Sequence, residues 1–186
     1  LVFGKPVAHV GYFDRAPARL VGEQQERAEN AAKAIRYHNA FLDDCCRKLL
    51  PHDLVLLGAP SGIGKTDLAL NISTSNAMHG KNVHYFALEA EPRELERRTK
   101  FALLSQAAYA KQAAYGGQGH PQRDKLNFTD WMGGDCEGIV AEYNADVEQQ
   151  IGERLRNLWT FYRGQDFDAK DLRARILEIH KQTDLI

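Results

Sequence analysis

The chain has 186 residues, of which 44% are hydrophobic and 26% are charged, as expected of a globular protein with one ordinary domain. Its formal net charge of −1 argues against a surface-wide basic field for nucleic acid, although a local basic loop remains compatible with it. The sequence shows no apolar run that would span a bilayer and no N-terminal signal pattern, so we expect a cytoplasmic protein without a membrane segment.

Cysteine and histidine give no sign of a metal site. The three cysteines, Cys45, Cys46 and Cys136, lack metal-ligand spacing, and we expect them to be reduced and structural. The seven histidines are scattered singly, which disfavours zinc.

The N-terminal part of the chain differs in composition from the rest. Residues 1–22 mix glycine and proline with single apolar residues, which is typical of an extended arm. Good helix formers with a thin apolar stripe follow at residues 23–38, and a short helix is predicted at residues 41–50, before Pro51. We therefore expect an arm and linker helix at residues 1–40 and the main domain at residues 41–186.

The main domain alternates between strand and helix patterns. The unbroken apolar run at residues 54–57 predicts a buried parallel strand, and residues 83–88 predict a second one. Helices are predicted at residues 67–78 and from Pro92 to about residue 114. After a break at residues 115–120, we predict a helix, a strand, a helix and the start of a strand at residues 137–155, 158–162, 168–179 and 184–186. This order predicts an α/β fold with a parallel sheet flanked by helices.

A glycine-rich stretch joins the first predicted strand to its helix, and it consists of Ala59, Pro60, Ser61, Gly62, Ile63, Gly64, Lys65 and Thr66. Small residues let successive backbone N–H groups turn toward phosphate oxygens, and a lysine at this spacing reaches the β and γ phosphates. The Thr66 hydroxyl is a hard oxygen ligand for Mg²⁺. The stretch therefore predicts a P-loop that binds ATP and Mg²⁺, with Asp67 in the same helical turn. The usual pattern has glycine where this chain has Ala59.

Residues on both sides of the loop resemble a known family. Phe41-Leu42-Asp43-Asp44, then residues 49–57 and the alanine-first loop, and then residues 79–89 are similar to the RecA-like ATPase core of DnaB-type replicative helicases. The likeness covers about residues 41–104. It implies a RecA-like fold and an ATP-hydrolysing DNA helicase or loader, which acts on single-stranded DNA as a homo-oligomeric ring or filament.

The resemblance also assigns catalytic roles. In that family a glutamate at the end of the second core strand orients the attacking water, a role that falls on Glu89, with Lys65 on the phosphates. We expect Glu89 to follow a strand that lies beside the P-loop strand, with its carboxylate directed toward the phosphates. Glu91 is the rival, although its place before Pro92 is explained more simply as a helix-start anion.

The sequence departs from the family at its C-terminal end. No stretch reads as the Walker B element, whose opening residues would be Thr183 to Ile186, and no arginine finger is found. We therefore expect the sheet to be truncated before the Walker B strand is complete, and this chain alone to hydrolyse ATP poorly. A nucleoside or nucleotide kinase and a nucleotide-binding scaffold with little turnover remain alternatives.

Three other groups of residues were considered for function. Charged residues on the predicted helix after Pro92, including Arg98 and Glu94, normally form a solvated face. The aromatic residues Trp131, Trp159, Phe161 and Tyr162 are more typical of a core than of base stacking. The helix at residues 23–38 is a candidate for docking on an adjacent protomer.

Overall fold

The computed structural model describes residues 16–114, 126–164 and 168–186. The break predicted at residues 115–120 and the first 15 residues of the predicted arm lie outside these ranges. The elements in chain order are α1 Ala16–Lys33, α2 Ala40–Cys46, α3 Lys65–Met78, β1 Val83–Ala87, α4 Pro92–Ala114, α5 Phe128–Gly133, α6 Glu137–Arg154, β2 Leu158–Tyr162, α7 Ala169–Ile179 and the 3₁₀ helix His180–Gln182. Within the described ranges, no helix is long and apolar enough to cross a membrane.

A small parallel sheet lies at the centre of the molecule. Strands β1 and β2 are parallel, with Val83 opposite Leu158 at one end and Ala87 opposite Tyr162 at the other. Leu185 forms a parallel bridge with Val83, and its carbonyl accepts a hydrogen bond from the backbone N–H of His84 at 2.9 Å. Strand β1 is therefore paired on both edges, which confirms the strands predicted at residues 83–88 and 158–162 and the start of one at residues 184–186.

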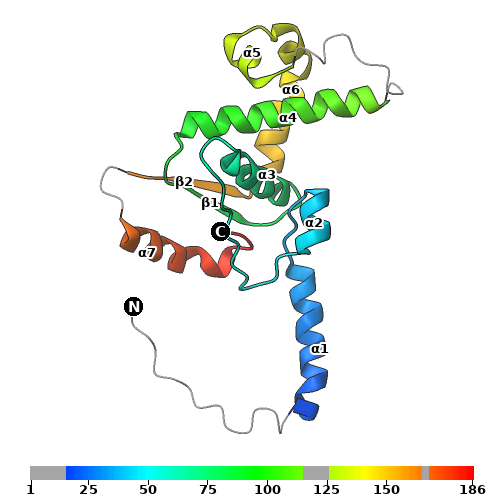
Figure 1. The fold of residues 1–186 in the computed structure, drawn as a ribbon, viewed down its shortest axis with the longest axis vertical. Helices are drawn as coiled ribbons and strands as arrows, with labels where there is room; N and C mark the ends of the chain where they lie inside the picture. Colours follow the sequence, from blue (N-terminus) through cyan, green and yellow to red (C-terminus); the bar gives the residue numbers. More distant parts are fainter. Residues whose placement is uncertain (1–15, 115–125, 165–167) are drawn as a thin grey trace.

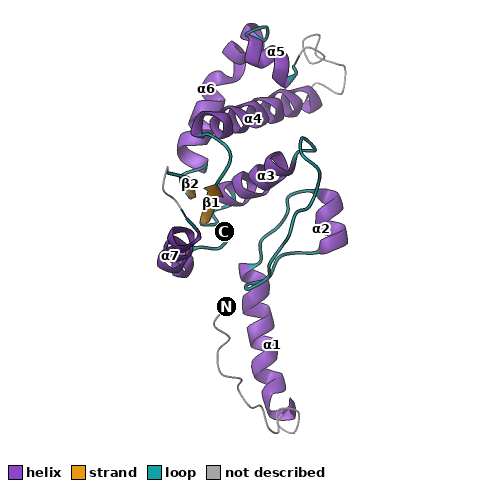
Figure 2. Ribbon diagram, turned by 60° about the vertical axis from the view of Figure 1, so that its left-hand side comes forward, coloured by secondary structure: helices purple, strands orange, loops and turns teal. Residues whose placement is uncertain are grey.

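Helices cover both faces of this sheet, with α3 and α4 on one side and α7 on the other (Figures 1 and 2). On the first face, Ala87 of β1 packs with Leu70 of α3 and Leu95 of α4 in a buried cluster. On the opposite face, the side chain of Arg175 in α7 lies 4.7 Å from the ring centroid of Phe161. The layered arrangement confirms an α/β fold with helices on both sides of a parallel sheet.

A second core joins α4 to α6 away from the sheet. It contains Leu103 and Leu104 of α4 with Tyr143 and Val147 of α6, and Trp131 packs against it. Helix α5, which carries Trp131, was not predicted from the sequence. The Asn127 side chain caps its start by accepting a hydrogen bond from the backbone N–H of Asp130, and glycine ends it in the left-handed conformation.

The strand predicted at residues 54–57 is wrong for this structure. The segment has no regular secondary structure, and the side chains of Leu54 and Leu56 are 85% and 87% exposed. It also does not lie beside β1, whose partners are β2 and Leu185. An apolar run of this kind forms a strand when neighbouring strands pair with its backbone and helices cover its faces, and within the described ranges residues 54–57 have no such pairing.

The expectation for the cysteines holds only in part. Cys45, Cys46 and Cys136 all lie in the described ranges, and none of them forms a disulfide there. Cys136 is buried, as expected of a structural cysteine, but Cys45 and Cys46 are exposed at the end of α2.

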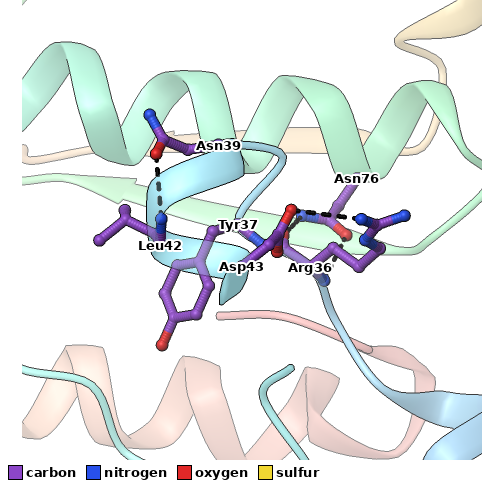
Figure 3. A network of polar contacts seen from close by, with 6 residues as sticks. All are labelled: Arg36, Tyr37, Asn39, Leu42, Asp43 and Asn76. Atoms are coloured by element: carbon purple, nitrogen blue, oxygen red, sulfur yellow. Dashed lines mark hydrogen bonds and ion pairs between the residues drawn. The ribbon is translucent and has the colours of Figure 1, made fainter. Parts of the chain in front are cut away.

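Helix α1 projects from the body of the molecule, and a polar network anchors the chain that follows it to α3 (Figures 1 and 3). The side-chain amide of Asn76, which is 2% exposed, donates hydrogen bonds to the carbonyl oxygens of Arg36 at 2.7 Å and Ile72 at 2.8 Å. The Asp43 carboxylate accepts from the backbone N–H of Tyr37 at 2.9 Å. The network therefore holds residues 36–43 against the C-terminal end of α3.

We expect Asn76→Ala to lower the free energy of unfolding by about 1–3 kcal/mol, because it removes the hydrogen bonds that the buried Asn76 amide donates to the Arg36 and Ile72 carbonyls. Urea unfolding followed by circular dichroism measures the change. Asn144→Ala is the matched control, since Asn144 makes only an exposed contact with Glu148 on α6, and we expect less than about 0.5 kcal/mol there. Equal stability of the two variants would contradict the anchoring role.

Candidate functional site

Two glycines shape the glycine-rich loop that precedes α3. Gly62 has a φ of +81° and Gly64 a φ of +97°, values that L side chains adopt only with strain. A Cβ on Gly62 would meet no atom within 4 Å, so the backbone conformation, rather than lack of space, requires glycine there. These turns deliver the chain directly into the first residue of α3, Lys65.

The Lys65 side chain folds back over the loop. Its ammonium group donates hydrogen bonds to the carbonyl oxygens of Ala59 at 2.7 Å and Pro60 at 2.9 Å. No side chain caps the N-terminus of α3, which begins after Gly64. The first N–H groups of a helix carry partial positive charge, so this end combines the helix dipole, the lysine and glycine turns in one place. The arrangement is suited to binding an anion.

The first turn of α3 also carries a carboxylate. Asp67 Oδ1 accepts a 2.6 Å hydrogen bond from Nη1 of Arg98 in α4, and the other oxygen lies 3.9 Å from the position that a Cβ on Gly64 would take. Arg98 is held in turn by Glu94, whose Oε1 accepts from Nη2 at 2.8 Å and from Nε at 3.0 Å. The hydrogen bond to Asp67 raises the pKa of Arg98 above its ordinary value. Arg98 therefore bridges the loop helix and α4.

A cavity of about 390 Å³ lies between α3 and α4, with Asp67 and Arg98 in its wall. Its lining includes no residue of the loop at 59–66. The loop lies outside this cavity, and Gly62 and Ile63 are exposed while Lys65 and Thr66 are half-buried.

The two candidate bases, Glu89 and Glu91, differ in their position relative to α4. Glu89 lies two residues beyond the end of β1 and is exposed. Ala87 and Ala90 on either side of it pack in the cluster that contains Leu70 of α3, so the packing links this turn to the loop helix. The carbonyl of Glu91 accepts hydrogen bonds from the N–H groups of Glu94 and Leu95, which places Glu91 at the start of α4.

A model of the DnaB-like helicase C-terminal domain matches residues 35–131, just over half of the chain. The chain belongs to the DnaB-like helicase C-terminal domain family. No significant match was found among curated proteins or among solved structures. The matched range contains the glycine-rich loop, β1 and the whole of α4, and it begins with Ile35, one of the buried residues that connect α1 to the domain.

Membership in the DnaB-like family implies ATPase and helicase chemistry at a general level, in which a nucleotide and Mg²⁺ are typical. In this chain Thr66, half-buried in the second position of α3, offers one hard oxygen next to the uncapped helix end. Within the described ranges, no three His, Cys, Asp or Glu side chains gather as a metal site. The Thr66 hydroxyl is thus the side-chain oxygen of the loop that would hold a Mg²⁺ ion bound together with a nucleotide.

The assignments of Ala59 to Asp67 and of Glu89 remain predictions. The sequence reading missed the link between Asp67 and Arg98. The only signal for it was the i,i+4 spacing of Glu94 and Arg98, which indicates a surface ion pair and gives no partner 31 residues away.

Proposed function

We propose that this chain binds ATP with Mg²⁺ at residues 59–66, with Asp67 following in the same helical turn, and hydrolyses it as part of a DnaB-type or RecA-type DNA helicase or loader. The observation that carries the proposal is the family match over a loop in which two left-handed glycines lead into an uncapped helix that begins with lysine. The composition and the family both favour a cytoplasmic protein.

Each residue of the loop has a proposed role. The N–H groups from Gly62 to Thr66 surround the phosphates, and Lys65 exchanges its bonds to the Ala59 and Pro60 carbonyls for the β and γ phosphates. The Thr66 hydroxyl would hold Mg²⁺, and the bound ion would supply positive charge to the triphosphate. Glu89 orients the attacking water, because phosphoryl transfer to water depends on positioning and charge compensation more than on covalent help.

The proposed partners follow from the family. They are single-stranded DNA and further copies of the chain in a ring or filament. With a net charge of −1, the chain does not have the basic surface that would attract DNA as a whole, so contact with DNA would depend on a local basic segment.

Calorimetry of the full chain with ATP, with and without Mg²⁺, followed by phosphate release with and without single-stranded DNA, tests the proposal. We expect Mg²⁺-dependent binding of ATP and faster phosphate release when DNA is present. Transfer of phosphate to a small acceptor would instead identify a kinase, and binding without any turnover would identify a nucleotide-binding scaffold. Absence of binding at millimolar ATP would reject the site.

A further inference from the structure

Asp67 is an unexpected residue for a turn that is to hold phosphate. It is the third residue of α3, and its carboxylate lies between the loop and α4, with one oxygen near Gly64 and the other on Arg98. An acidic side chain in a first helical turn stabilises an empty helix end, because it faces the positive end of the dipole. The same charge repels a bound triphosphate. Left uncompensated, a unit charge at this range would weaken binding by about tenfold.

Arg98 is arranged so that it cancels this charge. Arg98 donates two hydrogen bonds, from Nε and Nη2, to one oxygen of Glu94, and these bonds fix its guanidinium on α4 while Nη1 donates to Asp67. Its side chain is 30% exposed, compared with 57% for Asp67, so the cation is the more ordered and more shielded member of the pair. Ion pairs whose partners are held in place contribute more than ordinary surface pairs.

The pair of Asp67 and Arg98 also lies close in sequence to the buried cluster that joins α3 to β1 and α4. Leu70, one turn beyond Asp67, packs with Ala87 at the end of β1 and with Leu95, one turn before Arg98. Arg98 therefore belongs to the helix that begins three residues after Glu89, at Pro92, while its partner belongs to the helix that begins at Lys65. The ion pair fixes these two helices to each other at the end nearest the loop.

We propose that Arg98 is a positioning residue for nucleotide binding, which neutralises Asp67 in the phosphate-binding turn and thereby raises the affinity for ATP. This inference rests on the proposed function. It assigns a role to Arg98 of α4 that is exerted through Asp67. Among the hydrogen bonds of the described residues, Arg98 donates to Glu94 and Asp67 and to no backbone atom of the loop.

The test is a double-mutant cycle on the full chain, with ATP affinity measured by calorimetry in Mg²⁺. We expect Arg98→Ala to bind ATP about tenfold more weakly, and Asp67→Asn alone to bind it at least as tightly as the natural chain. The double variant Asp67→Asn with Arg98→Ala should return to within about twofold of the natural affinity. The loss in Arg98→Ala should also shrink when the salt concentration is raised, since exposed charges are screened.

Lys100→Ala is the matched control. Lys100 lies on the same helix and pairs with Glu96 at 2.6 Å, but this pair does not connect α4 to α3. We therefore expect the ATP affinity of Lys100→Ala to equal that of the natural chain. If Arg98→Ala weakens binding and Asp67→Asn does not rescue it, Arg98 acts only by supporting the fold and the inference is wrong. Weaker binding by Asp67→Asn alone would also overturn it, because the carboxylate would then be a ligand itself.

Lys65→Ala, measured alongside, separates the inference from the function on which it rests. If Lys65→Ala loses ATP while Arg98→Ala binds it normally, the inference fails and the proposed site stands. If Lys65→Ala keeps its affinity, the proposed site fails, and the inference fails with it.

Discussion

Lys65→Ala should weaken ATP binding on the order of 100-fold, because it removes the one side-chain cation that begins the loop helix. A charge-assisted hydrogen bond contributes about 1.5–3 kcal/mol, and each 1.4 kcal/mol corresponds to tenfold in affinity. The fold should survive, since the Lys65 ammonium contacts only the carbonyls of Ala59 and Pro60 in an exposed loop. Calorimetry with ATP and Mg²⁺ measures the affinity, and thermal unfolding measures the stability.

Lys170→Ala is a suitable control for this prediction. Lys170 is the second residue of α7, so it is also a lysine in the first turn of a helix, but the capping box of Asp168 and Asp171 occupies that end. We expect its ATP affinity to equal that of the natural chain. Equal affinities of all three proteins would show that the glycine-rich loop does not bind the nucleotide.

The elements that the sequence predicted well are those with strong local signals. Pro92 fixes the first residue of α4, and Asp168 with Asp171 forms the capping box of α7. Strands β1 and β2 are short runs of β-branched and aromatic residues, and they were predicted to within one residue. These signals depend on neighbours in the sequence, so they can be read without knowledge of the tertiary structure.

The failures come from features that depend on distant parts of the chain. An apolar run such as residues 54–57 predicts a strand only on the assumption that other strands pair with it, and that assumption does not hold in the described structure. Helix α5 has six residues, too few for a periodic pattern, and its Trp131 packs against a core formed by other helices.

For the candidate site, the sequence predicted the loop but not its electrostatic environment. Glycine, lysine and threonine at fixed spacing follow from the chemistry of phosphate binding, and the loop in the structure has the left-handed glycines that this chemistry requires. The pairing of Asp67 with Arg98 depends on how α3 and α4 pack on β1. Charges on α4 were therefore read as a solvated face, and the contact of Arg98 with α3 was not predicted.

Glu89→Gln should preserve ATP binding and lower the rate of hydrolysis by about 10²–10⁴-fold in an assembly that hydrolyses ATP. The amide keeps the shape of the carboxylate but cannot accept the proton of the attacking water. Because Glu89 is exposed, the substitution should leave stability unchanged. Single-turnover phosphate release, compared with calorimetric affinity, separates the chemical step from binding.

Glu91→Gln distinguishes the two glutamates of this turn. Its backbone carbonyl accepts the first hydrogen bonds of α4, and this contribution does not depend on the side-chain charge, so we expect nearly natural hydrolysis. If Glu91→Gln were the variant that lost turnover, the catalytic role would move by two residues, into the start of α4. If neither variant lost turnover, no carboxylate of this turn would act as the base, because Glu89 and Glu91 are the only acidic residues between β1 and α4 in this fully described segment.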